Sequence, residues 1–187
     1  ILPQLRYSRI TASVDVIGKS DEQINKLFDT NPSELTVDEM LYAATLTDNL
    51  ARRKAIYQAV TKYYPNDFRG FNNLGAVQYE EKDYAAAQAS FKKAEKLAPK
   101  NAEVQMNLGL IALLNKDYAT ANRCFGNAGG LEELGDALGV YYLKQGDVSA
   151  AVKAFGNSKT NNAALAQILA KDYSKAKTTL AAIPAPD

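Results

Sequence analysis

The sequence predicts an all-α protein built from about four to five stacked helical hairpins, preceded by a short N-terminal β-strand segment. Three glycines, Gly75, Gly109 and Gly139, each precede a phenylalanine on the following predicted helix. The step from Gly75 to Gly109 is 34 residues, which is the period of a helix–turn–helix repeat. Because one such unit cannot bury its apolar face alone, neighbouring units must stack. A stack of this kind favours a binding surface over a chemical pocket.

The composition argues against several classes of function. The 187 residues include 22 basic and 21 acidic side chains, spread along the chain, so no basic stripe indicates nucleic-acid binding. No apolar run is long enough to span a membrane, so we expect no membrane insertion by this segment. With no histidine and a single cysteine, Cys124, the chain lacks the residues for a structural zinc site or a Cys–His nucleophile. We expect Cys124 to be a small packing residue.

The N-terminal segment differs from the rest. Over residues 5–17, Ile10 and Val14 belong to an alternation of apolar and polar residues that is typical of a half-buried strand. A single strand has unpaired backbone groups, so its partner is expected upstream of residue 1 or in a second copy of the chain. We therefore divide the chain into an extended strand and linker, 1–19, and a helical repeat domain, 20–187. Self-association through strand 5–17 follows as an expectation.

Two capping boxes are predicted to start the first helices. Gly18-Lys19-Ser20 resembles the end of a phosphate-binding loop, but Ser13 stands where that motif needs glycine. The stronger interpretation is that Ser20 caps a helix over 21–29, with Gln23 as its reciprocal partner. Thr36 and Glu39 form the same pattern ahead of a helix over 37–46.

The first repeat pair is degenerate, and the second is complete. A helix over 50–63 ends at Tyr64-Pro65 and carries Arg53 where the later repeats have alanine. The next unit spans 68–101, with helices over 68–81 and 84–97 and Asp83 as an N-cap. In this unit we expect the small residues to let the two helices approach closely while phenylalanine fills the gap; they are Gly75, Ala87, Phe91 and Ala94.

Later units shorten. The turn aspartates Asp83, Asp117, Asp147 and Asp172 are separated by 34, 30 and 25 residues. Glycine follows both Phe125 and Phe155, which predicts that it ends short second helices in the third and fourth units. A fifth unit of two short helices ends at Ile183-Pro184, and no polar capping helix follows it in the sequence.

The 68–101 unit resembles the tetratricopeptide repeat (TPR). It matches at seven signature positions, which are Phe71, Leu74, Gly75, Ala87, Phe91, Ala94 and Pro99. The aromatic that usually stands three residues after the glycine is replaced by Gln78, with Tyr79 next to it. The units over 102–131 and 132–158 resemble the repeat at fewer positions. The resemblance implies a right-handed α-superhelix with a concave groove formed by the first helix of each pair.

The order of segments is similar to that of a second family. ILPQLRYSRITASVDVIGKSDEQI, then NPSEL, then LYAATLTDN resembles envelope lipoproteins of anaerobic Gram-negative bacteria, in which an OmpA-like domain precedes such repeats. The resemblance implies that residues 5–17 are the last strand of a truncated OmpA-like domain. It also implies a cell-envelope location, periplasmic or associated with the outer membrane. The peptidoglycan-contacting residues of such domains would lie upstream, so none is assigned here.

Repeat register predicts which side chains face the groove. The candidate protein-binding residues are Tyr42, Arg69, Asn72, Tyr79, Glu80, Glu103 and Met106. Apolar anchors flanked by charges are typical of peptide grooves. Leucines at helical spacing are more often core, so we expect Leu110, Leu113 and Val140 to pack within the solenoid. The basic partners of a carboxylate clamp are missing beside Asn73 and Asn107, so we reject clamp binding.

The sequence therefore predicts a non-catalytic protein-interaction scaffold with a protein or peptide partner of unknown identity. The alternative is a structural spacer or self-association element without a ligand groove. No catalytic, cofactor or metal site is predicted. The acidic residues Glu132, Glu133 and Asp136 could form an acid–base pair, but acids at this spacing usually form a solvated helix face.

Overall fold

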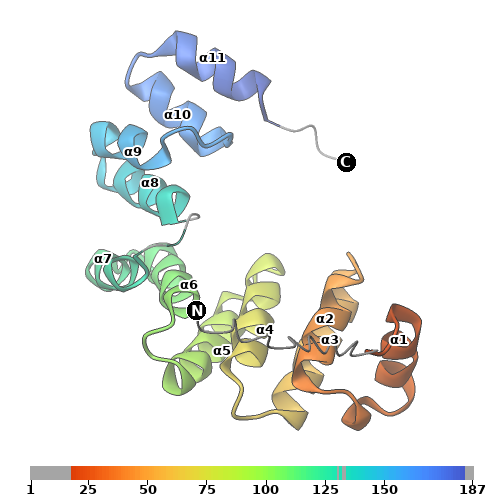
Figure 1. Ribbon diagram of the computed structural model, residues 1–187. Helices are drawn as coiled ribbons and strands as arrows, with labels where there is room; N and C mark the ends of the chain where they lie inside the picture. The colour runs from red at the N-terminus through yellow and green to blue at the C-terminus, as the bar shows by residue number, and fades with distance from the viewer. Residues whose placement is uncertain (1–17, 130, 132–133, 184–187) are drawn as a thin grey trace, which may run out of the picture.

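The computed structural model describes residues 18–129, 131 and 134–183, which form a curved stack of helices (Figure 1). Within these residues there are five consecutive helical hairpins, α2–α3 to α10–α11, with α1 and a short 3₁₀ turn in front of them. The bounds are α1 Asp21–Thr30, η1 Pro32–Glu34, α2 Val37–Thr45, α3 Leu50–Tyr63, α4 Phe68–Glu80, α5 Tyr84–Leu97, α6 Ala102–Leu114, α7 Tyr118–Asn127, α8 Leu134–Gln145, α9 Val148–Phe155, α10 Asn161–Leu169 and α11 Tyr173–Ala181.

The predicted fold class needs one correction. The all-α stack is confirmed, but the N-terminal strand is not part of it, since every regular element in the described ranges is helical. The segment assigned to that strand, residues 5–17, lies outside the described residues. An alternating pattern gives a stable strand only where another strand pairs with it, and the described part of the chain offers none. The boundary between 1–19 and 20–187 stays a prediction.

Polar caps fix where the helices begin. Both predicted capping boxes are confirmed: Ser20 with Gln23 starts α1, and Thr36 with Glu39 starts α2. The four turn aspartates each accept a hydrogen bond from a backbone N–H in the first turn of α5, α7, α9 or α11. The residue before each aspartate has a positive φ, and it is Lys82 (65°), Lys116 (59°), Gly146 (77°) or Lys171 (64°). The four turns therefore share one left-handed geometry, for which glycine is the unstrained choice.

Glycines opposite phenylalanines set the spacing within three hairpins. A Cβ added to Gly75 would lie 2.6 Å from Phe91, one on Gly109 2.5 Å from Phe125, and one on Gly139 2.5 Å from Phe155. No side chain fits at those distances, so the ring lies directly on the backbone of the first helix. This confirms the predicted role of the small residues.

The second helices of the third and fourth hairpins are short, as predicted, but glycine ends only one of them. Gly156 caps α9 with a φ of 55°. Gly126 lies inside α7, whose C-cap is Ala128, so the prediction was wrong there. The backbone N–H of Ala128 donates to the carbonyl oxygens of Cys124 and Phe125, which carries the helix past the glycine.

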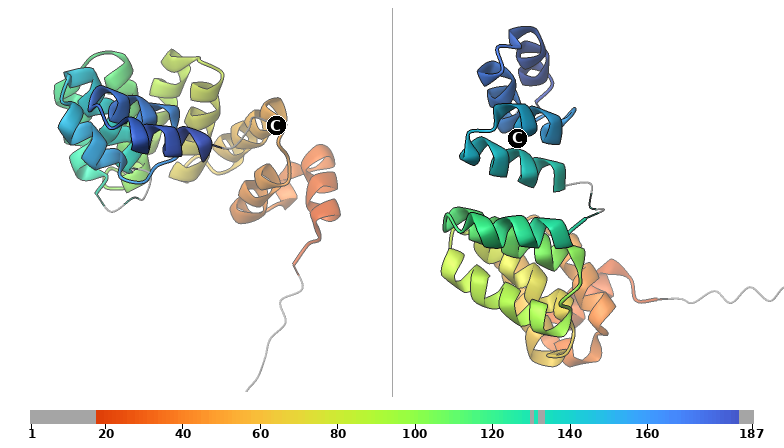
Figure 2. Two further views of the ribbon diagram at one scale, coloured as in Figure 1. Left: turned by 90° about the horizontal axis from the view of Figure 1, so that it is seen from above. Right: turned by 90° about the vertical axis from the view of Figure 1, so that its left-hand side faces the viewer.

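The stack curves so that α6 and α10 lie on its inner side and their partners α7 and α11 on its outer side (Figure 1). Figure 2 shows α8–α11 stacked beyond α6 and α7, with the described end of the chain at the far end from α1. The core is a chain of apolar clusters, in each of which one hairpin meets a neighbouring helix. First helices such as α6 and α10 therefore form the inner side of the stack (Figure 1).

Candidate protein-binding groove

A small pocket lies between α4 and α6 on the predicted groove face. It has a volume of about 140 Å³ and is lined by Ala76, Tyr79, Glu80, Phe91, Asn107 and Leu110, which we call the Tyr79 pocket. Two of the seven candidate residues, Tyr79 and Glu80, therefore meet in one site. Leu110 packs against the cluster that contains Leu113 and Phe125, as expected, but it is only half-buried and also lines this pocket. Leu113 is buried, as expected.

Tyr79 is held by its neighbour across the turn. Its ring lies edge-on to that of Tyr84, with 5.3 Å between the ring centroids. Partial burial raises the pKa of the Tyr79 hydroxyl, and the nearby Tyr84 adds to the shift. The hydroxyl therefore stays protonated at neutral pH and can donate a hydrogen bond to a ligand. An aromatic body with a polar tip suits a binding anchor.

Acidic side chains at the end of α4 are paired with basic ones on α3. Glu80 lies 3.7 Å from Arg53, and Glu81 lies 2.6 Å from Lys54. Arg53 is the residue that replaces the small side chain of the later repeats, and this contact gives its structural reason. The carboxylate of Glu80 at one edge of the Tyr79 pocket is therefore balanced by the positive charge of Arg53.

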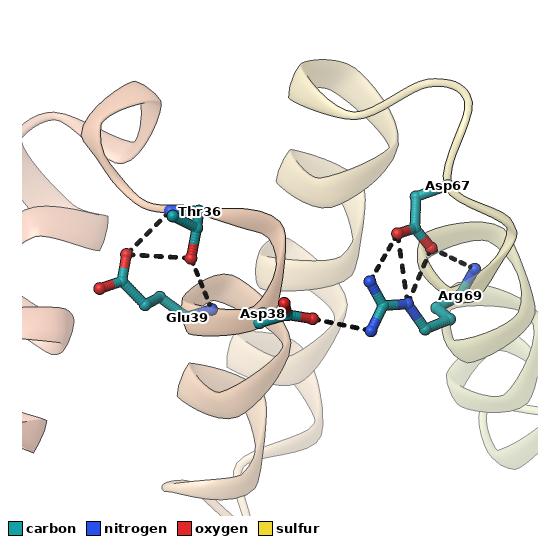
Figure 3. A network of polar contacts seen from close by, with 5 residues as sticks. All are labelled: Thr36, Asp38, Glu39, Asp67 and Arg69. Atoms are coloured by element: carbon teal, nitrogen blue, oxygen red, sulfur yellow. Dashed lines mark hydrogen bonds and ion pairs between the residues drawn. The ribbon is translucent and has the colours of Figure 1, made fainter. Parts of the chain in front are cut away.

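Arg69 is engaged by two carboxylates and joins α4 to α2 (Figure 3). Its guanidinium donates to Asp67 at 2.7 Å and to Asp38 at 2.8 Å, while Glu39 completes the neighbouring cap with Thr36. The Arg69 contacts hold the pKa of the Asp67 carboxyl below its usual value. Arg69, one of the candidate binding residues, is therefore already paired with carboxylates of the chain itself.

Asn72 is placed within the stack. It is 4% exposed, and its side-chain oxygen accepts a hydrogen bond from Asn107 at 3.0 Å. Met106 is half-buried and packs against the cluster that contains Leu113 and Phe125. Asn72 and Met106 therefore help to join α4, α6 and α7, and Asn107 presents part of its amide to the Tyr79 pocket.

The two remaining candidates lie outside the pocket. Tyr42 on α2 is exposed, and its hydroxyl donates to Asp21 at 3.1 Å. Glu103 is exposed in the first turn of α6, where a carboxylate interacts favourably with the helix dipole. The structure thus brings Tyr79 and Glu80 together and leaves Tyr42 and Glu103 apart from them.

The described residues contain no group of three or more histidine, cysteine, aspartate or glutamate side chains that could hold a metal ion. Cys124 is buried as predicted, and burial raises the pKa of its thiol, which keeps it protonated. Among the helices of the described ranges, none is both long and apolar enough to cross a membrane.

The chain was compared with models of known protein families. A tetratricopeptide repeat model matches residues 52–100 and, overlapping them, 79–121. Residues 52–121, less than half of the chain, are therefore similar to tetratricopeptide repeats. The resemblance read from Phe71, Gly75 and Phe91 is therefore confirmed, and TPR domains generally mediate protein–protein interactions without catalysis. The finer resemblance to OmpA-like envelope lipoproteins is not shown by these matches. No curated protein sequence matches the chain.

Solved structures share the fold of this chain at low sequence identity. The Cut9 and Hcn1 hetero-tetramer of the APC/C contains a chain similar over 84% of this one, with a TM-score of 0.69 and 16% identity. This chain covers only 34% of that protein. PilF of Pseudomonas aeruginosa is similar over 84% of this chain and 78% of its own, with a TM-score of 0.62 and 20% identity. YrrB, described as a TPR protein with an unusual peptide-binding site, is similar over 87% of this chain and 91% of its own, with a TM-score of 0.57 and 17% identity.

Two residues in or beside the Tyr79 pocket were not among the candidates: Asn107 lines it, and Tyr84 contacts Tyr79. Tyr84 belongs to the second helix, so a register based on first helices passes over it, although it orders Tyr79. Asn107 was considered only as part of a carboxylate clamp. The signal that could have identified it is its register with Asn73, which places an amide on the groove side of consecutive repeats.

Proposed function

We propose that this chain is a non-catalytic scaffold that binds an extended peptide segment of another protein across α4 and α6. The observation that carries the proposal is the Tyr79 pocket, whose lining combines Tyr79 and Asn107, which have polar groups, with the apolar side chains of Ala76, Phe91 and Leu110. Extended peptides need apolar pockets for alternate side chains and polar groups for their backbone. The Tyr79 pocket offers apolar space for one side chain and polar residues beside it.

Its size and electrostatics limit what would fit. A volume of about 140 Å³ holds one aliphatic or small aromatic side chain, so one anchor residue of the peptide enters between the helices. Because Arg53 and Arg69 are engaged by Glu80 and by Asp38 and Asp67, neither offers a free cation for a peptide carboxylate. The proposed ligand is therefore an internal segment of a protein with one apolar anchor.

A displayed library of random extended peptides tests this function. We expect selection on the whole chain to yield peptides with a shared apolar residue. Tyr79→Ala should weaken the selected peptides by tenfold or more in titration calorimetry, since about 1.4 kcal/mol corresponds to tenfold. Tyr63→Ala is the matched control, because Tyr63 is 37% exposed on α3 and lines no part of the Tyr79 pocket. Equal binding by wild type and Tyr79→Ala would contradict the proposal.

We also propose that this scaffold works in the bacterial envelope. The support is the similarity of segments 1–24, 31–35 and 41–49 to OmpA-associated envelope lipoproteins. Cell fractionation with an antibody against the chain tests the location. Recovery with the envelope fraction is expected, and recovery only with the cytoplasmic fraction would overturn this part.

A structural spacer without a ligand groove is the second candidate. It is favoured by the burial of Asn72 and Leu113, which fills much of the groove with the chain's own side chains. The same peptide selection separates the two functions. A spacer yields no peptide whose binding depends on Tyr79, whereas a scaffold does.

A further inference from the structure

The last hairpin repeats the register of the earlier ones. Ala164 stands eight residues before Asp172, as Gly75 stands eight before Asp83, and Leu180 stands eight after, as Phe91 does. Against the third hairpin, the same register pairs Ile168 with Leu113, Tyr173 with Tyr118, and Leu180 with Phe125. Residues at equal register face the same way in helical repeats, so each pair is directly comparable.

In the third hairpin these positions are covered by the next first helix. Leu113 and Phe125 form a cluster with Ala137 of α8, and Tyr118 packs against it. The ring of Tyr141, also on α8, lies 6.4 Å from that of Tyr118 and 6.1 Å from that of Phe125, edge-on in both cases. A small residue and an aromatic four positions apart on α8 therefore cover this face.

In the last hairpin no element of the described ranges covers the same face. We name Ile168, Tyr173 and Leu180 the terminal apolar face; they are 41%, 64% and 46% exposed. Their counterparts Leu113 and Phe125 are 3% and 2% exposed. Across the described part of the chain, no helix follows α11 to cover it. In the third hairpin a neighbouring helix buries these apolar positions, whereas in the last hairpin the equivalent side chains are exposed. Such exposed apolar side chains mark a surface where a further helix fits.

Charge indicates which helix fits. Between Val148 and Ile183 there are five lysines and one acid, Asp172, whose carboxylate already caps α11. Lys171, Lys175 and Lys177 are all exposed, and Lys177 stands four residues after Tyr173 and three before Leu180 on α11. A second copy placed face to face would bring these lysines together and be repelled. A partner with acidic residues flanking its apolar stripe would be attracted.

We propose that the terminal apolar face docks an amphipathic helix of another protein, seated on α10–α11 as α8 sits on α6–α7. The docking helix carries a small residue and an aromatic four positions apart, as Ala137 and Tyr141 do on α8, and acidic residues beside that stripe. This surface lies at the end of the stack, apart from the Tyr79 pocket. It gives the chain a second interaction site of different chemistry.

The test uses a fluorescent helical peptide with the sequence of residues 134–145, in which Lys144 is replaced by glutamate and three glutamates are added at each end. Its binding to the whole chain is followed by fluorescence anisotropy. We expect saturable binding that Leu180→Asp weakens at least tenfold. Leu97→Asp is the matched control, since Leu97 is 41% exposed on α5 and Leu180 46% on α11. Circular dichroism verifies that both variants keep the helical content of the wild type.

A charge exchange completes the test. Lys175→Glu with Lys177→Glu should weaken the glutamate-flanked peptide and strengthen a lysine-flanked version of it. Binding no tighter than that of a scrambled peptide of equal charge would overturn the proposal, as would equal weakening by Leu180→Asp and Leu97→Asp. A dimer in sedimentation velocity that Leu180→Asp abolishes would also overturn it, because the occupant would then be a second copy.

Discussion

The second and last hairpins follow the same plan and reach different degrees of burial. In α4–α5 a glycine receives a phenylalanine that is 1% exposed, and α6 covers the pair. In α10–α11 the equivalent positions hold Ala164 and Leu180, and Leu180 is 46% exposed. The hydrogen bonding of one buried glutamine position differs as well. Ser90 donates to the side-chain oxygen of Gln78 at 2.7 Å. Gln167 stands at the same register as Gln78, and its side-chain oxygen is buried without a partner in the described structure. The comparison teaches that a repeat gains its stability from the neighbour that follows it.

The largest difference is expected for the side chain in the middle of the second helix. Phe91→Ala should lower the free energy of unfolding by about 3–5 kcal/mol, because it empties a buried site. Leu180→Ala should lower it by about 1 kcal/mol, since nearly half of that side chain is already in water. Urea unfolding followed by circular dichroism measures both. Equal losses in the free energy of unfolding would show that the two side chains are equally well packed, which would contradict the comparison.

We expect Gly75→Ala and Gly126→Ala to change the free energy of unfolding in opposite directions. Gly75→Ala puts a Cβ 2.6 Å from the Phe91 ring and should destabilise by about 1–3 kcal/mol. Gly126→Ala is the control, since it lies inside α7 with no atom within 4 Å of an added Cβ. It should stabilise by about 0.5–1 kcal/mol through helix propensity alone. Thermal unfolding of both variants decides the matter, and a stabilised Gly75→Ala would refute the close packing of α4 on α5.

The turns should respond alike in both hairpins. Lys82 and Lys171 have φ values of 65° and 64°, so replacing either with glycine should relieve backbone strain and stabilise by about 0.5–1 kcal/mol. Gly146→Ala, with a φ of 77° in the native turn, should destabilise by about 1 kcal/mol. Melting temperatures compared with wild type provide the measurement. Opposite effects at Lys82 and Lys171 would mean that the two turns are not equivalent.

The smallest expected effect is a pH dependence at the N-terminal end, which is closed by α1. A hydrogen bond from the Thr36 backbone, followed by one from Lys19, lowers the pKa of the Glu39 carboxyl. Because the folded pKa is below the unfolded one, this stabilisation is present above a pH of about 4.3 and is lost as the pH falls further. Glu39→Gln keeps a reciprocal cap but cannot titrate. Its unfolding midpoint in urea should therefore fall less between pH 5 and pH 3 than that of wild type.

Much of this architecture could be predicted because its determinants are local. Helix starts follow from Ser20, Thr36 and the turn aspartates, whose side chains cap the next few backbone N–H groups. The repeat period follows from Gly75 and Gly109, since only glycine admits the phenylalanine ring. Where a local signal competes with packing it is less reliable, and helix α7 continues through Gly126 for that reason.

The candidate groove was harder to predict, because exposure depends on neighbours that are distant in sequence. Register placed Asn72 on the groove side, but a hydrogen bond from Asn107, one repeat later, buries it. Arg69 looked available, yet Asp38, two helices earlier, pairs with it. In the opposite direction, Leu110 resembled a core residue and lines the Tyr79 pocket. Only the three-dimensional arrangement determines which of these side chains a ligand can reach.

Native-state hydrogen exchange of the whole chain tests most directly whether the following neighbour completes a repeat. We expect amides in α10 and α11 to exchange through local openings that cost less free energy than those of α4 and α5 by about 2 kcal/mol or more. Adding the glutamate-flanked peptide should slow exchange in α10 and α11 and leave α4 and α5 unchanged. Equal protection of both hairpins in the free chain would contradict the account.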